Sequence, residues 1–343
     1  MTSLEHLKGD LVLAREIGAI VHTMKVLAAV GMRQYEQAVE VLDAYEGTVE
    51  RGLIALFRGR HVDLTGRAVL PAQEMIASGG RLALIVVGSD QGLCGRFNQD
   101  VVRHAVVSLQ ERGLPLRVPL VLALGGRTEG ALERAGCRPQ RVLDMPVSAD
   151  GIGPVVEEVL TVLDEWRTRR AVERVVVVAH ERFIPRRDAA GGEVTSVPPV
   201  PRTTRLLPPA SAWLQRLGAQ PWPSRSLPAW KMPWEELLAR LLRQHVFCSL
   251  YRVLALSLAA ENESRLRAMQ RAEDNVEKRL DVLTRAIHVE RRELVTRQML
   301  DVVAGYEASV GVASPSRRRT RGTKPDANRN AMGARSRAPQ ADH

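Results

Sequence analysis

Two glycine-rich turns carry the residue types in this sequence that could take part in chemistry. The first reads Gly88-SDQGLCG and the second reads Gly125-GRTEG. Consecutive backbone N–H groups in a turn of this kind can hold an anion. A tight connection between a strand and a helix accounts for the same glycines more simply. We therefore favour a structural turn at both places and keep an anion cradle as the alternative.

The patterns that usually accompany catalysis are missing. The chain has neither G-x-x-x-x-G-K-[ST] nor a G-x-G-x-x-G after its first strand, and it has no H-E-x-x-H. Cys94 lies between two glycines and could be a nucleophile, but no histidine is close to it in the sequence. The three cysteines, Cys94, Cys137 and Cys248, are too widely spaced to indicate a metal site or a disulfide framework. We predict no catalytic residue, no cofactor and no metal.

Composition and charge describe a soluble chain with a basic end. Of the 343 residues, 45% are hydrophobic and 26% are charged. No apolar run reaches 18 residues, and the N-terminus lacks a secretory pattern, so we expect a cytoplasmic protein. The formal net charge is +10, and eight basic against two acidic residues place +6 of it in residues 314–343. We predict that the tail 312–343 is disordered, and its charge alone does not indicate nucleic-acid binding.

The turns belong to a segment in which strands and helices alternate. Strands are expected at Arg81–Asp90, Val118–Gly126, Arg141–Pro146, Glu173–His180 and, as a further extended piece, Glu193–Val197. Helical spacing occurs at Phe97–Arg112, Arg127–Ala135 and Ile152–Thr168. This alternation predicts a Rossmann-like open α/β domain at residues 75–200. Nine prolines in the 36 residues from Pro198 to Pro233 predict a stiff connection at 201–233.

Long proline-free stretches flank this domain at 1–60 and 234–311. Both carry apolar residues at steps of three and four, which keeps one seam on one side of a helix. The first seam includes Leu4, Leu7, Leu11, Ala14, Ile17, Val21, Met24, Ala28, Met32, Tyr35, Val39, Leu42, Tyr45, Val49, Leu53 and Leu56. The second includes Cys248, Tyr251, Ala255, Leu258, Asn262, Leu266, Met269, Ala272, Val276, Leu280, Leu283, Ile287 and Leu294.

These two seams predict a long antiparallel coiled coil of N- and C-terminal helices, with the α/β domain inserted between them. Glycines weaken the first helix by up to about 1 kcal/mol each relative to alanine, so this helix needs a partner. Asn262 interrupts the second seam. It either sets the register of the pair or forms a solvated notch, and the sequence leaves both readings open.

Three separated segments resemble the gamma subunit of F-type ATP synthases. Glu261–Asn275 and Arg291–Gly305 are similar to two C-terminal segments of that family, and Thr23–Gln34 is similar to part of its first helix. The first turn looks like the family's S-D-x-G-L-C-G-x-x-N turn. The matching residues are Ser89, Asp90, Gly92, Cys94, Gly95 and Asn98. The resemblance covers about residues 1–309.

This resemblance implies a non-catalytic rotor subunit of a proton- or sodium-transporting ATP synthase, present once per complex. The coiled coil would lie inside a hexamer of alternating alpha and beta subunits, with the insert near the epsilon subunit and the membrane c-ring. The complex would sit at the cytoplasmic face of the bacterial inner membrane, and no nucleic-acid partner is implied. Contacts with the beta subunits would come from Arg265, Arg267, Arg291, Arg292, Thr296 and Gln298.

The sequence also departs from the family pattern. Arg292 stands where the family usually has Gln, Gln298 where it has Glu, and His288 where it has Asn. These changes look more like a divergent bacterial branch that is often linked to sodium pumping. The tail beyond Val310 is extra, and we expect it to act as a tether or an electrostatic brake outside the hexamer.

Two other functions remain as alternatives. A coiled-coil scaffold with a basic nucleic-acid-binding tail predicts binding that depends steeply on salt. A small-molecule enzyme built on residues 88–95 predicts a loss of turnover in Cys94→Ala.

Overall fold

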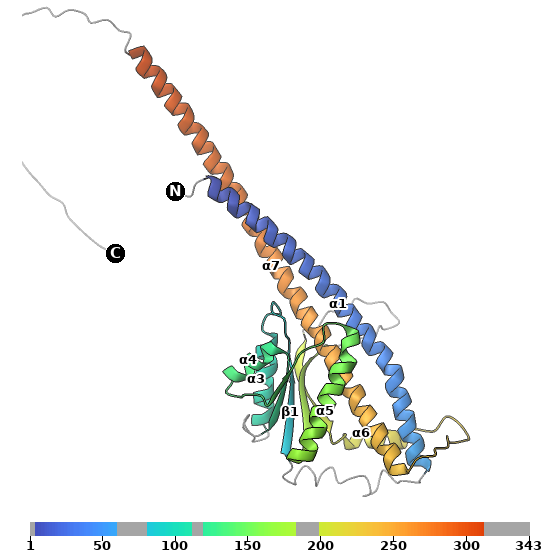
Figure 1. Ribbon diagram of the computed structural model, residues 1–343. Helices are drawn as coiled ribbons and strands as arrows, with labels where there is room; N and C mark the ends of the chain where they lie inside the picture. The colour runs from blue at the N-terminus through green and yellow to red at the C-terminus, as the bar shows by residue number, and fades with distance from the viewer. Residues whose placement is uncertain (1–3, 60–80, 112–118, 183–198, 312–343) are drawn as a thin grey trace, which may run out of the picture. The chain divides into compact units, whose positions relative to one another are not determined.

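The computed structural model describes residues 4–59, 81–111, 119–182 and 199–311 (Figure 1). The extended piece expected at Glu193–Val197 and the tail at 312–343 lie outside the described residues. Within them, an α/β insert follows one long helix and precedes another. No helix among these residues is long and apolar enough to cross a membrane.

The insert is built on a five-stranded sheet with the order β3-β2-β1-β4-β5. Its strands are β1 (Arg81–Val87), β2 (Leu120–Leu124), β3 (Arg141–Leu143), β4 (Val172–Glu181) and β5 (Val200–Leu207). The first four strands are parallel, and β5 pairs antiparallel with β4. The continuous apolar runs of β1, β2 and β4 suit strands that are covered on both faces.

Successive residues of β1 enter two different cores. Leu82, Leu84 and Val86 pack against α3 (Phe97–Gln110) and α4 (Gly126–Arg134). Ala83, Ile85 and Val87 face α5 (Ile152–Arg170) and belong to a core that also contains residues of both long helices. Figure 1 shows α3 and α4 on one side of the sheet and α5 on the other. The insert therefore shares one continuous core with the long helices.

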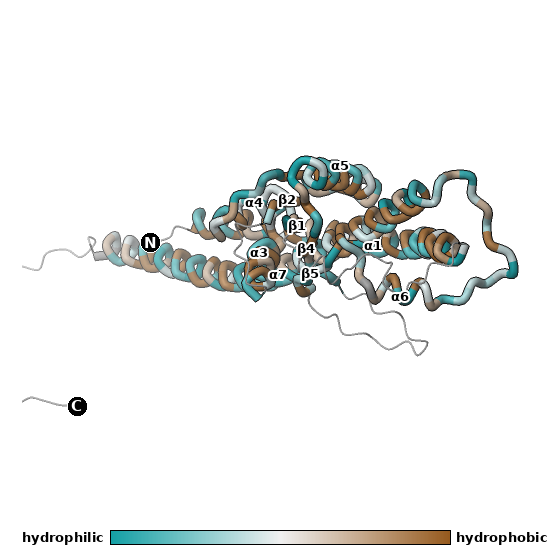
Figure 2. Tube along the Cα trace, turned by 90° about the horizontal axis from the view of Figure 1, so that it is seen from below, coloured by the Kyte–Doolittle hydropathy of each residue, from teal (hydrophilic) through white to brown (hydrophobic). Residues whose placement is uncertain are grey.

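The two long helices are α1 (Leu4–Gly59) and α7 (Trp234–Gly311). They run antiparallel, because residue numbers rise along α1 as they fall along α7. Lys25 pairs with Glu273, and Glu46 pairs with Arg252. Figure 2 shows apolar and polar residues interspersed along α7. The expected helix–insert–helix arrangement is confirmed, and α7 continues without a break through the buried Met269.

The buried residues of α1 repeat every seven positions as far as Val49, apart from Val39, and residues 53–57 are all buried. Residues seven apart are buried, namely Ala14, Val21, Ala28, Tyr35, Leu42, Val49 and Leu56. The wider seam expected from the sequence was wrong at two places, because Ile17 is 44% exposed and Tyr45 is 47% exposed. A helix that meets a single partner buries a narrower stripe than one that lies on a broad core.

Glycines of α1 lie where the helices approach each other closely. A Cβ added to Gly31 would come within 3.2 Å of Asn262 Oδ1, and one added to Gly18 within 3.3 Å of Val276 Cγ1. A Cβ on Gly47 would meet nothing within 4 Å. Gly18 and Gly31 therefore allow a close helix contact, in addition to weakening the isolated helix.

The proline-rich segment contains regular structure that the sequence analysis did not predict. The strand β5 extends the sheet to Leu207, and α6 (Ser211–Ala219) follows it. Leu217 of α6 is fully buried in a core with Leu53 and Cys248, and Trp213 stacks on His245 at a ring distance of 3.8 Å. Prolines at strand edges and in the loops between elements leave both elements intact.

The chain divides into two compact units, Met1–Thr284 and Arg285–His343. The first contains the insert and a pair formed by α1 and residues 234–284 of α7, which we call the helix pair. The described part of the second, residues 285–311, is helical. Leu294, which was expected to continue the apolar seam, is 43% exposed in this second unit.

Candidate interaction sites

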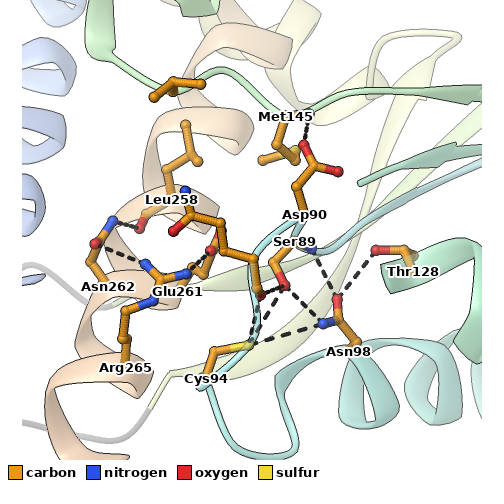
Figure 3. A network of polar contacts seen from close by, with 12 residues as sticks. Ser89, Asp90, Cys94, Asn98, Thr128, Met145, Leu258, Glu261, Asn262 and Arg265 are labelled. Atoms are coloured by element: carbon orange, nitrogen blue, oxygen red, sulfur yellow. Dashed lines mark hydrogen bonds and ion pairs between the residues drawn. The ribbon is translucent and has the colours of Figure 1, made fainter. Parts of the chain in front are cut away.

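The turn after β1 is held by the side chain of Asn98. The Ser89 N–H donates a 2.9 Å hydrogen bond to Asn98 Oδ1, and Asn98 Nδ2 donates a 2.8 Å bond to Ser89 Oγ. Thr128 Oγ1 donates to the same Asn98 Oδ1 at 3.2 Å (Figure 3). All three residues are buried, so these bonds satisfy groups that water does not reach. The end of β1 is thereby tied to α3 and α4.

Asp90 joins the same turn to the second glycine-rich turn. Its Oδ1 accepts a 2.6 Å hydrogen bond from the Gly126 N–H, and its Oδ2 accepts one of 2.6 Å from the Met145 N–H. Gly125 has φ of 94°, and a Cβ there would approach the Ser89 backbone to 2.6 Å. The two turns interlock at a position that only glycine can occupy. Ser89, Asp90 and Asn98 thus have a structural role.

Cys94 lies in the same turn but is unsuited to nucleophilic catalysis. The residue is buried, and its Sγ lies 3.6 Å from Ser89 Oγ. Burial raises the pKa of the Cys94 thiol, which keeps it protonated, whereas a nucleophilic cysteine needs a lowered pKa. Cys248 is buried in the core next to α6, and burial raises its pKa to about 11. The enzyme alternative therefore loses its candidate nucleophile.

A cavity of about 320 Å³ lies where the Asp90–Gln91 turn meets α1 and α7. Glu261 of α7 lines it and is buried. Burial raises the pKa of Glu261 to about 6, although Arg265 Nη2, 2.5 Å from Glu261 Oε1, acts in the opposite direction. The loss of hydration on burial outweighs the attraction of one guanidinium. Glu261 is thus an ionisable group at the contact between the insert and the helix pair (Figure 3).

Asn262 is bonded within α7 and faces α1. Its Nδ2 donates a 2.9 Å hydrogen bond to the Leu258 carbonyl, and its Oδ1 accepts one of 3.2 Å from Arg265 Nη1. Asn262 is half-buried, and its amide lies against Gly31 of α1. This position favours the reading in which Asn262 helps to set the register of the helix pair.

The two arginines expected to meet a partner early in α7 are paired within the chain. Arg265 contacts Glu261, and its side chain is only 13% exposed. Arg267 pairs with Glu263, and its side chain is 33% exposed. Arg267 is therefore the more accessible of the two. Another chain reaches Arg265 fully only if its ion pair opens.

The four expected partner residues further along α7 all lie on the surface of the second unit. Arg291, Arg292, Thr296 and Gln298 are exposed, and Thr296 Oγ1 donates a 2.9 Å hydrogen bond to the Arg292 carbonyl. Large apolar side chains are exposed on the same segment, namely Val289, Leu294, Val295, Met299, Leu300, Val302, Val303 and Tyr306. So many exposed apolar residues in one helix indicate a surface that binds another protein.

Ion pairs that the sequence did not predict join the insert to both helices. Arg182, directly after β4, pairs with Glu36 of α1, and its Nε lies 2.8 Å from Glu263 Oε2 of α7. The side chain of Arg182 is 15% exposed and that of Glu263 is 4% exposed. The only hint of these ion pairs in the sequence was the acidic residue Glu263, which directly follows Asn262 of the apolar seam. Its partner is about 80 residues away and could not be inferred from spacing.

Further ion pairs connect the two helices directly. Glu273 of α7 contacts His22 at 3.0 Å and Lys25 at 2.5 Å, and these contacts hold its pKa below the usual range. Arg252 contacts Asp43 at 2.6 Å and Glu46 at 2.5 Å. Among the described residues, no group of three or more His, Cys, Asp or Glu is placed to hold a metal ion.

Comparison with known sequences gives matches along nearly the whole chain. The sequence model of a family described as ATP synthase matches residues 3–308. The ATP synthase gamma chain of Nitrosomonas eutropha is 23% identical over 316 residues, which cover 90% of this chain and 100% of the relative. The gamma chain of Granulibacter bethesdensis is 25% identical over 313 residues, with coverage of 90% and 100%.

Comparison with solved structures gives the same fold. A chain in the Euglena gracilis mitochondrial ATP synthase, in an OSCP/F1/c-ring structure, has a TM-score of 0.55 and 16% identity. The match covers 93% of this chain and 98% of that one. A chain of the rotor from the same organism has a TM-score of 0.51 at 16% identity, with coverage of 85% and 98%.

Proposed function

Because this chain belongs to the ATP synthase family, we propose that it is the non-catalytic gamma subunit in the central stalk of an F-type ATP synthase. The match over residues 3–308 confirms the resemblance drawn from three short segments. The observation that carries the proposal is the antiparallel pairing of α1 with α7 through Met269, with the insert in the same core. A torque-bearing element has to be continuous and stiff in this way.

The proposed mechanism is mechanical. Rotation of the membrane ring turns the insert, and the shared core and the Arg182 ion pairs pass this motion to the helix pair. An asymmetric shaft makes different contacts with each catalytic site, and it can shift each site among binding states only through such differences in contact energy. ATP chemistry then belongs to the neighbouring subunits, and this chain supplies the coupling.

We assign the partners of the chain on the same basis. The exposed residues of 285–311 suit contacts with the alpha and beta subunits, and Arg291, Arg292, Thr296 and Gln298 are the proposed beta-subunit contacts. Arg265 and Arg267 are a second proposed contact, with Arg267 the more accessible. The insert is assigned to the epsilon subunit and the c-ring. We also propose that each complex contains one copy of this chain and that the complex lies at the cytoplasmic face of the bacterial inner membrane.

Reconstitution with the alpha, beta and epsilon subunits tests this function. We expect the full chain to co-purify with them and to support ATP hydrolysis and rotation of an attached bead. The double variant Arg291→Gln/Arg292→Gln should lower the hydrolysis rate by roughly tenfold or more, because charge-assisted contacts are worth about 1.5–3 kcal/mol each.

The matched control is Lys278→Gln/Arg279→Gln, which removes two exposed charges from the same helix. It should retain most of the hydrolysis rate. Equal losses in the two double variants would show that total charge matters and the positions do not. Failure to co-purify with the other subunits, together with tail-dependent binding to DNA, would instead favour the scaffold alternative.

A further inference from the structure

A second, smaller cavity of about 190 Å³ lies on the other side of the first glycine-rich turn, between that turn and α4. Asn98 and Gln99 of α3 line it, together with the turn residues Gly92–Gly95. From α4 it is lined by Arg127, Gly130 and Arg134. These three residues are three and seven positions apart, so they share one face of the helix. Nothing in the proposed rotor function uses this cavity.

The two arginines of the cavity have no acidic partner among the described residues. Several other arginines of the insert do: Arg103 contacts Asp100, Arg141 lies 3.6 Å from Glu165, and Arg169 lies 3.1 Å from the same carboxylate. Arg127 and Arg134 are both exposed and line the cavity from positions about two turns apart on α4. Two guanidiniums held at one small cavity repel each other unless an anion lies between them.

Glycines keep this space open. Arg127 Nη2 lies 3.0 Å from where a Cβ on Gly92 would stand, so any larger residue at position 92 would push the guanidinium away from the turn. A Cβ on Gly130 would lie 3.6 Å from Arg134 Nη1, which is an ordinary contact distance. Position 130 could therefore accept a side chain, and because Gly130 lines the cavity, such a side chain would take up part of its volume.

The surroundings add further positive potential. α3 starts beside the cavity with Arg96 as its N-cap residue and no side-chain cap, so its first N–H groups favour an anion, although Asp100 in the first turn offsets part of this effect. Arg271 of α7 approaches the opposite side of the turn, with Nη2 4.0 Å from where a Cβ on Gly95 would lie. These features support the arginine pair, which remains the main recognition element.

We propose that this cavity binds a phosphate group, either as inorganic phosphate or as the terminal phosphate of a nucleotide. A phosphate carries between one and two negative charges near neutral pH and matches the two guanidiniums, each of which can donate paired hydrogen bonds. The volume of about 190 Å³ holds a phosphate group but not a whole nucleotide, so a nucleotide would enter by its terminal phosphate. A bound anion would also hold α4 against the first turn.

Phosphate titration of the full chain tests this site by calorimetry, with ionic strength kept constant by potassium chloride. We expect saturable phosphate binding in the wild type. Arg127→Gln/Arg134→Gln should weaken it at least tenfold. The matched control Arg167→Gln/Arg170→Gln removes two exposed arginines from the end of α5 and should bind as the wild type does. This control also accounts for anion binding by the basic tail.

Gly130→Leu provides a second variant that leaves the net charge unchanged. It should abolish phosphate binding by filling the cavity, while circular dichroism verifies the fold. A parallel titration with ATP separates the sources, since tighter binding of ATP than of phosphate identifies a nucleotide and equal or weaker binding identifies free phosphate. Absence of saturable binding in the wild type, or equal weakening in the α4 and α5 double variants, would overturn the proposal. Neither result bears on whether the chain assembles with alpha and beta subunits.

Discussion

At the scale of single residues, the most informative group is the carboxyl of Glu261. It is buried where the insert meets the helix pair, and its raised pKa of about 6 shows that one arginine does not replace the water it has lost. The folded chain holds this proton to higher pH than the unfolded chain, in which the pKa is near 4.5. The stabilising contribution is therefore complete below about pH 4.5 and is lost as pH rises through 6.

We predict that Glu261→Gln changes the pH dependence of stability. The free energy of unfolding of the wild type, relative to the variant, should fall by about 1.5 kcal/mol between pH 4.5 and pH 6.5, because one pKa unit corresponds to about 1.36 kcal/mol and this window covers most of the titration of both states. Urea titrations at several pH values measure this difference. Other carboxyls titrate equally in both proteins and cancel. Glu158→Gln, at an exposed position of α5, should give a flat difference, and a flat difference for Glu261→Gln would refute the prediction.

At the scale of elements, the helix pair depends on close approach at a few positions. The apolar seam of α1 is narrow and contains small residues such as Ala14 and Ala28. Gly18 and Gly31 let α7 come near enough for Asn262 and Val276 to contact the α1 backbone. At these positions glycine lowers the helix propensity of α1 but permits close packing against α7. Packing against α7 is the larger effect on the stability of α1.

We predict opposite effects for the same substitution at two glycines of α1. Gly31→Leu should destabilise the chain by about 1–3 kcal/mol, because the leucine must displace Asn262. Gly47→Leu should be neutral or should stabilise it by up to about 1 kcal/mol, since its Cβ meets nothing and leucine is the better helix former. Thermal unfolding followed by circular dichroism at 222 nm measures both. Equal shifts at both positions would show that helix propensity alone governs α1.

At the scale of the molecule, the insert and the helix pair behave as one unit because they share a core and a buried ion network. Residues of β1, β4, α5, α1 and α7 meet in the same apolar cluster. Arg182 adds contacts to both long helices at once. Removing one partner from such a buried network strongly destabilises the folded protein, because the remaining charge stays buried without a counter-charge.

We predict that Arg182→Met loosens the insert from the helix pair. The free energy of unfolding should fall by about 3 kcal/mol, which is near the lower end of the effect of breaking a buried ion pair. Scanning calorimetry should then resolve two unfolding transitions in place of one. Arg202→Met is the control: its ion pair with Glu181 is exposed on both sides, so it should cost less than about 1 kcal/mol. A single unshifted transition in Arg182→Met would mean that the apolar core alone couples the two parts.

The local and periodic features of the fold could be predicted from the order of residues alone. Alternating strands and helices, long proline-free stretches and steps of three and four residues depend on neighbours in the chain, and they predicted the insert, both long helices and the family. The tertiary structure decided which faces of these elements are buried. Ile17 and Tyr45 fit the periodicity and are nonetheless exposed, whereas Arg182 and Glu263 are charged and nearly buried. Burial and ion pairing depend on how segments from about 80 to more than 200 residues apart meet, and periodicity within one helix carries no information about that.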